Sequence, residues 1–467
     1  MGKRKRVLLA TFGTLGDIYP FIAVAHAVSR RGLDVVIAAP EMHRGAIERE
    51  GIAYARLRPH ENDIVGALGV DLAGAFRIML KNPYFILDEI YLRFLSETYD
   101  DTLAAAKGAD AIVTHNLLVG ANLAAEASSL PTAKVALAPL YVQSAASPSL
   151  TPPAPYILQP NSRSAIGYNK LVRSFIRTGV NMRMKRFHSL RRALGLPRTD
   201  EDFFLDFGRK NGASKLFGLY SPRLAPRPAD GPANMEVPGF PFYEPRDEGR
   251  RQLSDSLRIF LFSGSAPIVF TLGSFAPQVS GDFYDVSLNA ARALGRRAIL
   301  LAGKNDAARL SASVGPNEFV CSEAPHDELF PLASCVVHHG GIGTTAQALR
   351  AGRPQLIVPF FGDQPDHGER VRRLGLGISL KLSSYNFRSA TRSLGELCDD
   401  SYLRAAQEFA QSIRAEPGVE AVADWAECVL GVAGPSRNDS EANACPIETP
   451  PAKSPSAVNL HPKLRTE

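Results

Sequence analysis

Continuous apolar runs alternate with helical patterns along the first part of the chain. Residues 7–12 and 34–39 form such runs, which are typical of strands buried on both faces of a parallel sheet. Between them, residues 18–30 carry apolar side chains at helical spacing and are followed by a glycine that can end the helix. Two more strands are expected at 111–114 and 133–137. This rhythm predicts a parallel sheet with right-handed crossovers, a Rossmann-like domain.

The same rhythm restarts after a proline-rich segment. Residues 221–249 contain seven prolines and three glycines without clear periodicity, which predicts a linker. Beyond it, further strands are expected at 267–272, 298–301, 335–339 and 355–359, with helices at 284–294 and 344–351. This second half therefore predicts a second Rossmann-like domain.

These patterns divide the chain into five segments. The two Rossmann-like domains are expected at 1–225 and 256–400, with a linker at 226–255 between them. Helical residues 401–433 are expected to pack back towards the first domain. The last 34 residues, 434–467, hold six prolines and four charges of each sign. They cannot bury enough apolar surface to offset their ordering entropy, so we predict a disordered tail.

The composition is that of an ordinary globular protein, with 45% hydrophobic and 21% charged residues among 467. The net charge of +6, from 53 basic and 47 acidic residues, is too small to demand nucleic acid as a partner. The five cysteines are odd in number and form no CxxC pair, which favours free thiols in a reducing compartment over a disulfide frame or a zinc site. No apolar stretch approaches roughly 18 residues, and no secretion signal is visible. We therefore expect a cytoplasmic protein, with peripheral contact to the inner face of the membrane left open.

The most informative segment, 338–345, reads HHGGIGTT and joins a predicted strand to a predicted helix. Backbone N–H groups and the helix dipole favour a phosphate at such a position. Glycines allow the backbone to come close, and His339 at the strand end can donate to a diphosphate. The alternative is a tight strand-to-helix turn without a ligand.

Two other predicted strands end in polar residues. Asp363 and Gln364 follow strand 355–359, and a carboxylate beside an amide can hold sugar hydroxyls. Ser274 follows strand 267–272 and offers a second phosphate contact. Three such strand ends around one crevice predict a nucleotide site at the switch point of the sheet.

The segment from Ala324 to Gly375, which includes VVHHGGIGTTAQALRAGRPQLIVPFFGDQ, resembles the donor-site signature of family 1 glycosyltransferases. The opening GTLGDIYP at 13–20 is similar to the G-x-x-G-D-x-x-P turn of bacterial and sterol members, and PGFP at 238–241 also resembles the family. The similarity covers residues 5–432. It implies a GT-B fold, in which two Rossmann-like domains face each other across a cleft. The first domain would bind the acceptor and the second the nucleotide sugar.

The resemblance also assigns donor-binding roles. His339 would contact the diphosphate, and Gln347 stands where the family often has a ribose-binding glutamate. Asp363 and Gln364 would hold the sugar hydroxyls. The other donor-binding residues are Gly16, Ser274, Gly341, Gly343 and Thr344. Glu323 replaces the tryptophan on which plant members stack the base, so the donor is left open as a UDP- or dTDP-hexose.

Asp17 is the predicted catalytic base, because inverting transfer needs a group that takes the proton of the acceptor hydroxyl. A solvated aspartate has a pKa of about 3.9, so its site should be partly desolvated. Capping of the first helix is the compatible structural alternative. His115, at the end of a strand on the same face, would orient Asp17 or contact the acceptor, with a core histidine as the alternative. The lone D-x-D, at 200–202, is interpreted as a helix cap or a surface pair, and neither a metal nor a cofactor is expected.

The sequence defines the acceptor less narrowly than the donor. Residues 64–95 and 140–190 are rich in apolar side chains, which suits a lipophilic acceptor. A basic face there can meet anionic lipid, an acidic acceptor or only water; it comprises Lys170, Arg173, Arg177, Arg183, Lys185, Arg186, Arg191 and Arg192.

Together these features predict an inverting glycosyltransferase that moves a hexose from a nucleoside diphosphate to a hydroxyl of a lipophilic small molecule. The phrase GDFY at 281–284 is most similar to bacterial rhamnosyltransferases that act on hydroxy-fatty-acid lipids. Glucosyl transfer to a sterol or polyketide is the alternative within the family. A nucleotide-sugar epimerase and a non-catalytic partner of another transferase are the alternatives outside it. No nucleic acid partner is expected, and the oligomeric state stays open.

Overall fold

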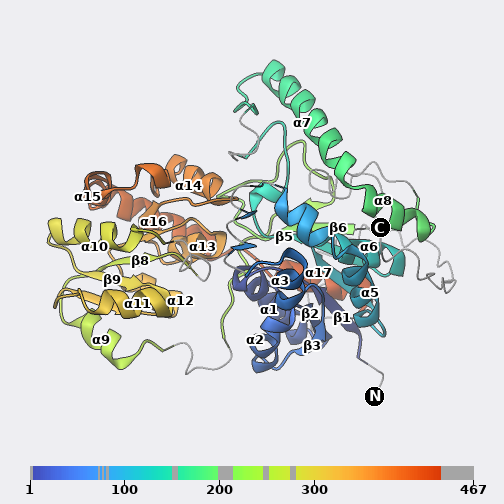
Figure 1. Ribbon diagram of the computed structural model, residues 1–467, viewed down its shortest axis with the longest axis horizontal. Coiled ribbons are helices and arrows are strands. Elements are labelled where there is room, and N and C mark those ends of the chain that lie inside the picture. Colours follow the sequence, from blue (N-terminus) through green and yellow to red (C-terminus); the bar gives the residue numbers. More distant parts are fainter. Residues whose placement is uncertain are drawn as a thin grey trace, which may run out of the picture.

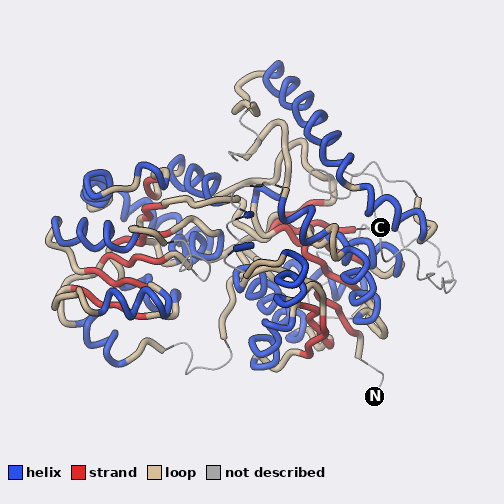
Figure 2. Tube along the Cα trace, in the orientation of Figure 1, coloured by secondary structure: helices blue, strands red, loops and turns tan. Residues whose placement is uncertain are grey.

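Two α/β domains make up the structure, as the sequence predicts. The structure is a computed structural model that describes residues 4–71, 74–75, 78–79, 82, 84–149, 156–197, 214–245, 252–273 and 280–432. The N-terminal domain, blue to green in Figure 1, lies beside the yellow-to-orange C-terminal domain. Figure 2 shows the strands of each domain gathered centrally, with helices around them. The predicted tail, 434–467, lies outside the described residues.

The N-terminal sheet has seven parallel strands in the order β3-β2-β1-β4-β5-β6-β7. Leu8 of the central strand pairs with Val36 on one side and Ile112 on the other. Because the order reverses between β1 and β4, a crevice opens at the carboxyl ends of these two strands. The strands are β1 (Arg6–Ala10), β2 (Asp34–Ala39), β3 (Ala53–Arg56), β4 (Ala111–His115), β5 (Thr132–Ala136), β6 (Ser214–Gly218) and β7 (Met235–Glu236).

Helices cover both faces of this sheet. Leu8 and Ala10 of β1 pack into a core with α5 and α6, whereas Val7 and Leu9 pack with α1 and α17 on the opposite face. This alternation follows from the two-residue period of a strand. The helices of the domain are α1 (Leu15–Arg30), α2 (Arg44–Arg49), α3 (Glu61–Leu68), α5 (Leu95–Ala105), α6 (Val119–Ser128), α7 (Arg163–Arg183) and α8 (Lys185–Ala193), with a π-helix, η2, at Ile86–Tyr91.

The C-terminal sheet has six parallel strands in the order β10-β9-β8-β11-β12-β13. Phe270 of β8 pairs with Leu300 and Val337, so this sheet also reverses at its centre. Its strands are β8 (Ile268–Thr271), β9 (Ala298–Leu301), β10 (Glu318–Cys321), β11 (Cys335–His338), β12 (Gln355–Ile357) and β13 (Gly377–Ser379). Its helices are α9 (Asp255–Phe262), α10 (Phe283–Ala293), α11 (Gly303–Ser311), α12 (His326–Leu329), α13 (Ile342–Arg350), α14 (Gln364–Arg373), α15 (Phe387–Glu396) and α16 (Asp400–Ile413).

The segments expected as a linker and as returning helices have structure of their own. Within 226–255, β7 pairs with β6 and extends the first sheet. The helix α17 (Glu420–Leu430) packs on α1 of the N-terminal domain, where Arg31 forms ion pairs with three of its acidic residues at 2.8–3.1 Å. In contrast, α16 packs against α13 in the C-terminal domain. The chain thus crosses between the domains twice.

Two expectations about the whole chain can be compared with the structure. Cys321, Cys335 and Cys398 are free thiols, but Cys428 is disulfide-bonded, so the expectation of five free thiols is wrong. Among the described residues, no helix is both long and apolar enough to cross a membrane.

Candidate active site

The turn between β1 and α1 fixes the carboxylate of Asp17. The Thr14 hydroxyl accepts a hydrogen bond from Gly16 N (3.2 Å), and Thr14 N donates to Asp17 Oδ2 (2.8 Å). This capping box satisfies backbone donors at the start of α1. Gly13 has φ +132°, and a Cβ there would lie 2.2 Å from Asp17 Oδ2, so only glycine fits. Asp17 is therefore a helix-capping residue, and the N–H of Gly16 is engaged within the turn.

The environment of Asp17 favours its protonated form. Loss of solvation raises its pKa to about 6, although hydrogen bonds from Thr14 act in the opposite direction. The negative charge of Asp363, from the other domain, raises this pKa further. The side chain keeps 29% exposure, so a ligand can still reach the carboxylate. These properties make Asp17 a stronger base than a solvated aspartate while leaving it accessible.

His115, the last residue of β4, lies beside Asp17 at the switch point of the sheet. Its Nε2 is 3.9 Å from Asp17 Oδ1. Burial lowers its pKa to about 4, so the ring is neutral near pH 7. Leu117 N donates to its Nδ1 (3.2 Å), which places the ring proton on Nε2, the side of Asp17. His115 thus offers an N–H towards the carboxylate.

The turn after β11 contains two histidines with different surroundings. His338 is held by Gln355 Oε1 (2.8 Å) and by the N–H of Gly340 (3.0 Å), so it packs within the domain. The ring of His339 fits against two glycines: a Cβ on Gly273 or Gly341 would approach it to 2.8 or 2.4 Å. Its Nδ1 is buried with no hydrogen-bond partner, and burial lowers its pKa to about 4. A buried unpaired ring nitrogen is costly unless a ligand supplies a partner.

The start of α13 is open next to His339. Gly341 is the N-cap residue, and a Cβ on Gly343 would meet no atom within 4 Å. Thr344 is buried, and the hydroxyl of Thr345 donates to Gly341 O (3.0 Å). The first N–H groups of a helix have no partner within the helix, so this end can receive an anion.

Asp363 at the start of α14 is linked to the same turn through His367. Nδ1 of His367 donates to the carbonyl of Gly340 (2.8 Å), and its Nε2 lies 3.8 Å from Asp363 Oδ2. Burial raises the pKa of Asp363. His367 therefore ties the predicted sugar-binding carboxylate to the predicted diphosphate-binding turn.

Gln364 has a different arrangement from the one expected of a sugar ligand. Its Oε1 accepts hydrogen bonds from Phe360 N (2.8 Å) and Phe361 N (3.1 Å), so this oxygen holds its own loop together. The residue is buried. Any contact of Gln364 with a sugar would have to come from its amide N–H groups.

Two tyrosines that the sequence analysis missed join the N-terminal side of the site. The ring of Tyr141, in the short helix η3 (Pro139–Tyr141), stands edge-on to His115 with 6.1 Å between ring centroids. Burial raises the pKa of Tyr141, and the charges of Asp363 and Asp17 raise it further. Burial and Asp17 likewise raise the pKa of Tyr91 in the π-helix. Tyr141 follows strand β5, so the strand-end argument could have found it, whereas no sequence pattern predicted the π-helix.

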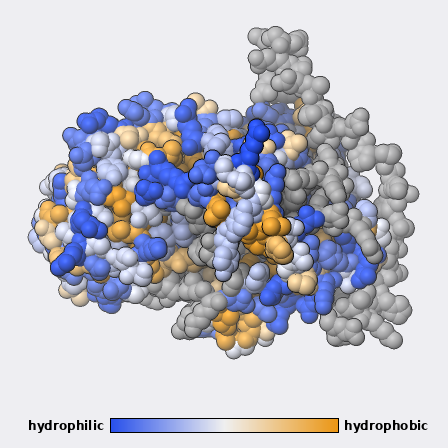
Figure 3. All heavy atoms as spheres, turned by 90° about the horizontal axis from the view of Figure 1, so that it is seen from above, coloured by the Kyte–Doolittle hydropathy of each residue, from blue (hydrophilic) through white to orange (hydrophobic). Residues whose placement is uncertain are grey.

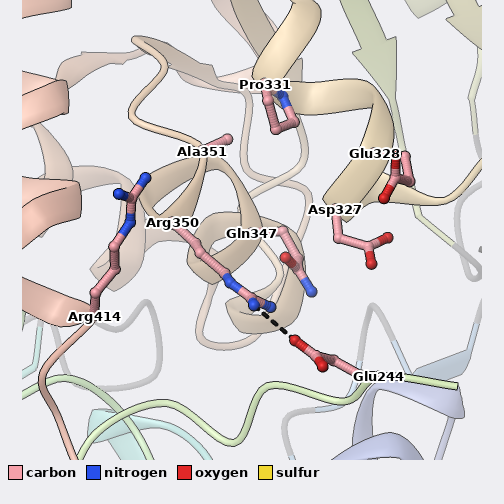
Figure 4. Close-up of a pocket in the computed structure, with 8 residues that line it drawn as sticks. All are labelled: Glu244, Asp327, Glu328, Pro331, Gln347, Arg350, Ala351 and Arg414. Atoms are coloured by element: carbon pink, nitrogen blue, oxygen red, sulfur yellow. Dashed lines mark hydrogen bonds and ion pairs between the residues drawn. The ribbon is translucent and has the colours of Figure 1, made fainter.

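A pocket of about 350 Å³ lies beside α13 (Figure 4). Arg350 of α13 donates to Glu244 Oε1 (2.7 Å) across it. Oε1 of Gln347 is buried without a hydrogen-bond partner and points into this region. The lining residues are Glu244, Asp327, Glu328, Pro331, Gln347, Arg350, Ala351 and Arg414.

Two features of the predicted site fall outside the part of the chain that the structure describes. Ser274 and the D-x-D pair at 200–202 lie outside the described residues. Within the described part of the chain, no group of three or more His, Cys, Asp or Glu side chains is arranged to hold a metal ion.

The two Rossmann-like domains thus bring a carboxylate each, Asp17 and Asp363, within electrostatic range of one another. One carboxylate follows a strand of each sheet, and a helix start that can receive an anion adjoins the second. This arrangement defines the chain as a GT-B type enzyme.

Comparisons with known proteins identify the family to which the chain belongs. Residues 7–146 match the glycosyltransferase family 28 N-terminal domain, and residues 287–428 match the erythromycin biosynthesis protein CIII-like C-terminal domain. Glycosyltransferase GtfE of Amycolatopsis orientalis is 30% identical over 405 residues, which cover 83% of this chain and 89% of that protein. The chain belongs to the family 1 glycosyltransferases and is a nucleotide-sugar-dependent transferase.

Other relatives span a range of acceptors. The O-mycaminosyltylonolide 6-deoxyallosyltransferase of Streptomyces fradiae is 28% identical, covering 90% of this chain and 98% of its own. The sterol 3-beta-glucosyltransferase UGT80B1 of Arabidopsis thaliana is 26% identical, covering 90% and 67%. Among solved structures, the kitacinnamycin glycotransferase has a TM-score of 0.68 at 17% identity, covering 92% of this chain and all of that one. The glycosyltransferase VinC, in complex with dTDP, has a TM-score of 0.62 at 18% identity, covering 92% and 100%. These structural likenesses confirm the predicted GT-B fold.

Proposed function

We propose that the protein transfers a hexose with inversion from a UDP- or dTDP-sugar to a hydroxyl of a lipophilic small molecule, and that Asp17 is the base. The observation that carries this proposal is the placement of Asp17: accessible, raised in pKa to about 6 and flanked by the N–H of His115. A base with a pKa near the working pH is best suited to take a proton during attack.

The proposed reaction gives each group one role. The acceptor hydroxyl gives its proton to Asp17 as its oxygen attacks the anomeric carbon from the N-terminal side. The bond from that carbon to the diphosphate breaks on the opposite side. Negative charge grows on the departing diphosphate, where His339 and the open N–H groups of α13 stabilise it. Asp363 accepts hydrogen bonds from the sugar hydroxyls, and the unpaired Oε1 of Gln347 accepts one from the ribose.

A single sequence motif, GDFY at 281–284, favours rhamnose as the transferred sugar. Two residues of this motif, Phe283 and Tyr284, are however buried in the core of the C-terminal domain. The Tyr284 hydroxyl donates to Leu301 O (2.7 Å). The motif therefore contributes to the packing of the domain and favours no particular sugar or acceptor. A macrolide, glycopeptide or sterol hydroxyl, as named for the relatives, is proposed as readily as a hydroxy-fatty-acid lipid.

Product formation tests the proposal. Purified protein is incubated with UDP-glucose or dTDP-rhamnose and with one acceptor at a time: a macrolide aglycone, a glycopeptide aglycone, a sterol or a hydroxy fatty acid. We expect the mass of at least one acceptor to increase by one hexosyl unit with UDP-glucose or one deoxyhexosyl unit with dTDP-rhamnose, and NMR should show the opposite anomeric configuration to the donor. Retention of configuration would exclude Asp17 as the base of a single displacement.

A further inference from the structure

The helix α7 carries a row of exposed apolar side chains. Tyr168, Leu171, Phe175 and Met182 are between 42% and 71% exposed. Their spacing of three, four and seven residues aligns them in one stripe along the helix. In Figure 1, α7 projects from the body of the N-terminal domain, and Figure 3, seen from above, shows hydrophobic residues exposed among hydrophilic ones. Contiguous exposed apolar residues mark interaction surfaces.

The opposite side of α7 holds the helix in place, so the stripe is not needed for folding. Asn169 is fully buried and donates to Ala145 O (2.9 Å) and Leu158 O (2.8 Å). Val180 packs into the core of the domain, and the guanidinium of Arg183 lies over the Tyr84 ring. The stripe is therefore available to a partner without disturbing the domain.

The charged residues of α7 and α8 are all basic. Residues 163–193 contain nine Lys or Arg and no Asp or Glu. Three of the arginines pair with acidic residues from other segments: Arg173 with Asp230, Arg183 with Asp88 and Arg191 with Glu126. Lys170, Lys185 and Arg186 are exposed, and none of them pairs with an acidic side chain within the described part of the chain. The exposed apolar stripe of α7 and the unneutralised cations of α7 and α8 together complement an anionic lipid surface.

We propose that α7 docks this protein on an anionic membrane surface. The four apolar side chains enter the boundary between headgroups and acyl chains, and the neighbouring lysines and arginines meet lipid phosphates. This interaction goes beyond the transfer reaction and does not depend on which sugar or acceptor is used.

Vesicle sedimentation tests the docking with the full chain. One set of vesicles contains phosphatidylcholine alone, and the other contains about one third phosphatidylglycerol. Each cation at an anionic surface contributes roughly fivefold to partitioning, so we expect at least tenfold tighter binding to the anionic vesicles, weakened by salt. Equal binding to both sets, or binding to neither, would overturn the proposal.

Matched variants locate the contact. The double substitution Leu171→Ser/Phe175→Ser should weaken anionic vesicle binding at least tenfold. Its control, Ile259→Ser/Phe262→Ser, removes two residues of α9 that are at least as exposed and should leave binding unchanged. Likewise, Lys170→Glu/Lys185→Glu should abolish binding, whereas Arg388→Glu/Arg392→Glu on α15 should have a smaller effect. Thermal melting confirms that each variant is folded.

Equal losses in the α7 variants and their controls would show non-specific adsorption and overturn the assignment. So would vesicle binding that survives both α7 variants. If the α7 variants instead lose a folded protein partner while wild-type protein ignores vesicles, the stripe is a protein-docking surface and the proposal is wrong.

Discussion

Nε2 of His115 lies 3.9 Å from Oδ1 of Asp17, and the hydrogen bond from Leu117 to Nδ1 leaves the ring proton on that same Nε2. Asp17 lies in the first turn of α1, which follows β1, and His115 ends β4; these two strands are adjacent where the sheet order reverses. Because burial lowers the pKa of His115, its ring is neutral near pH 7 and cannot act as a general acid there. Its geometry suits a positioning residue that directs the carboxylate.

Replacing His115 should therefore lower turnover without moving the pH dependence. His115→Phe keeps the buried volume filled but removes the N–H, and we expect kcat to fall by about tenfold. The acidic midpoint of the pH profile should stay near 6, since burial rather than His115 raises the pKa of Asp17. Steady-state kinetics from pH 5 to 8 measure both quantities. Unchanged kcat would assign His115 to the core alone.

The wild-type pH profile should report the base directly. Asp17 accepts a proton only when ionised, and its pKa is raised to about 6. The rate should therefore be constant above about pH 7 and fall about tenfold per unit well below pH 6. The measurement is kcat/KM at saturating donor. A midpoint near 4 would mean that Asp17 is solvated in the working enzyme.

Two glycines near the site should respond in opposite ways to alanine. Gly13→Ala places a methyl 2.2 Å from the Asp17 carboxylate at φ +132°. We therefore expect the free energy of unfolding to fall by about 1–3 kcal/mol, and activity to be lost.

Gly343→Ala places a methyl that meets no atom within 4 Å, so it should stabilise α13 by roughly 0.5–1 kcal/mol. Its methyl would occupy space proposed for the diphosphate, so dTDP affinity should fall. Denaturant unfolding and calorimetry separate these effects, and unchanged dTDP affinity in Gly343→Ala would move the anion elsewhere.

Diphosphate binding should draw a proton onto His339. Burial lowers its pKa to about 4 in the free protein, and a neighbouring diphosphate raises it again. UDP or dTDP should therefore bind more tightly at pH 5.5 than at pH 7.5, with proton uptake visible by calorimetry in two buffers. His339→Ala should lose at least tenfold in affinity and the pH dependence, while His339→Gln should keep part of the affinity. Proton uptake that persists in both variants would assign it to another group.

Several inner strands were predictable because they are largely buried and carry continuous apolar runs. β2 and β9 match the predicted residues, and an apolar run of four to six residues is typical of a buried strand. The missed outer strands β3 and β10 are only half-buried, so they carry no continuous apolar run. The two-residue β7 is too short for any pattern.

The site was predictable where chemistry follows a strand end. Asp17, His339 and Asp363 each follow a strand that the apolar pattern marks, and the structure brings Asp17 and Asp363 together. His367 was missed because its role depends on a carbonyl from another turn, that of Gly340. For the same reason, the internal use of the Gln364 oxygen could not be deduced from spacing.

The most direct test of the account is a comparison of Asp17→Asn with wild type in turnover and in donor binding. Asparagine can still cap α1 but cannot accept the proton. We predict that kcat falls by at least a hundredfold, while UDP or dTDP affinity by calorimetry stays within about twofold. Turnover close to wild type would contradict the assignment of Asp17 as the base. An equal loss of binding and turnover would contradict it as well, because Asp17 would then act in the donor site.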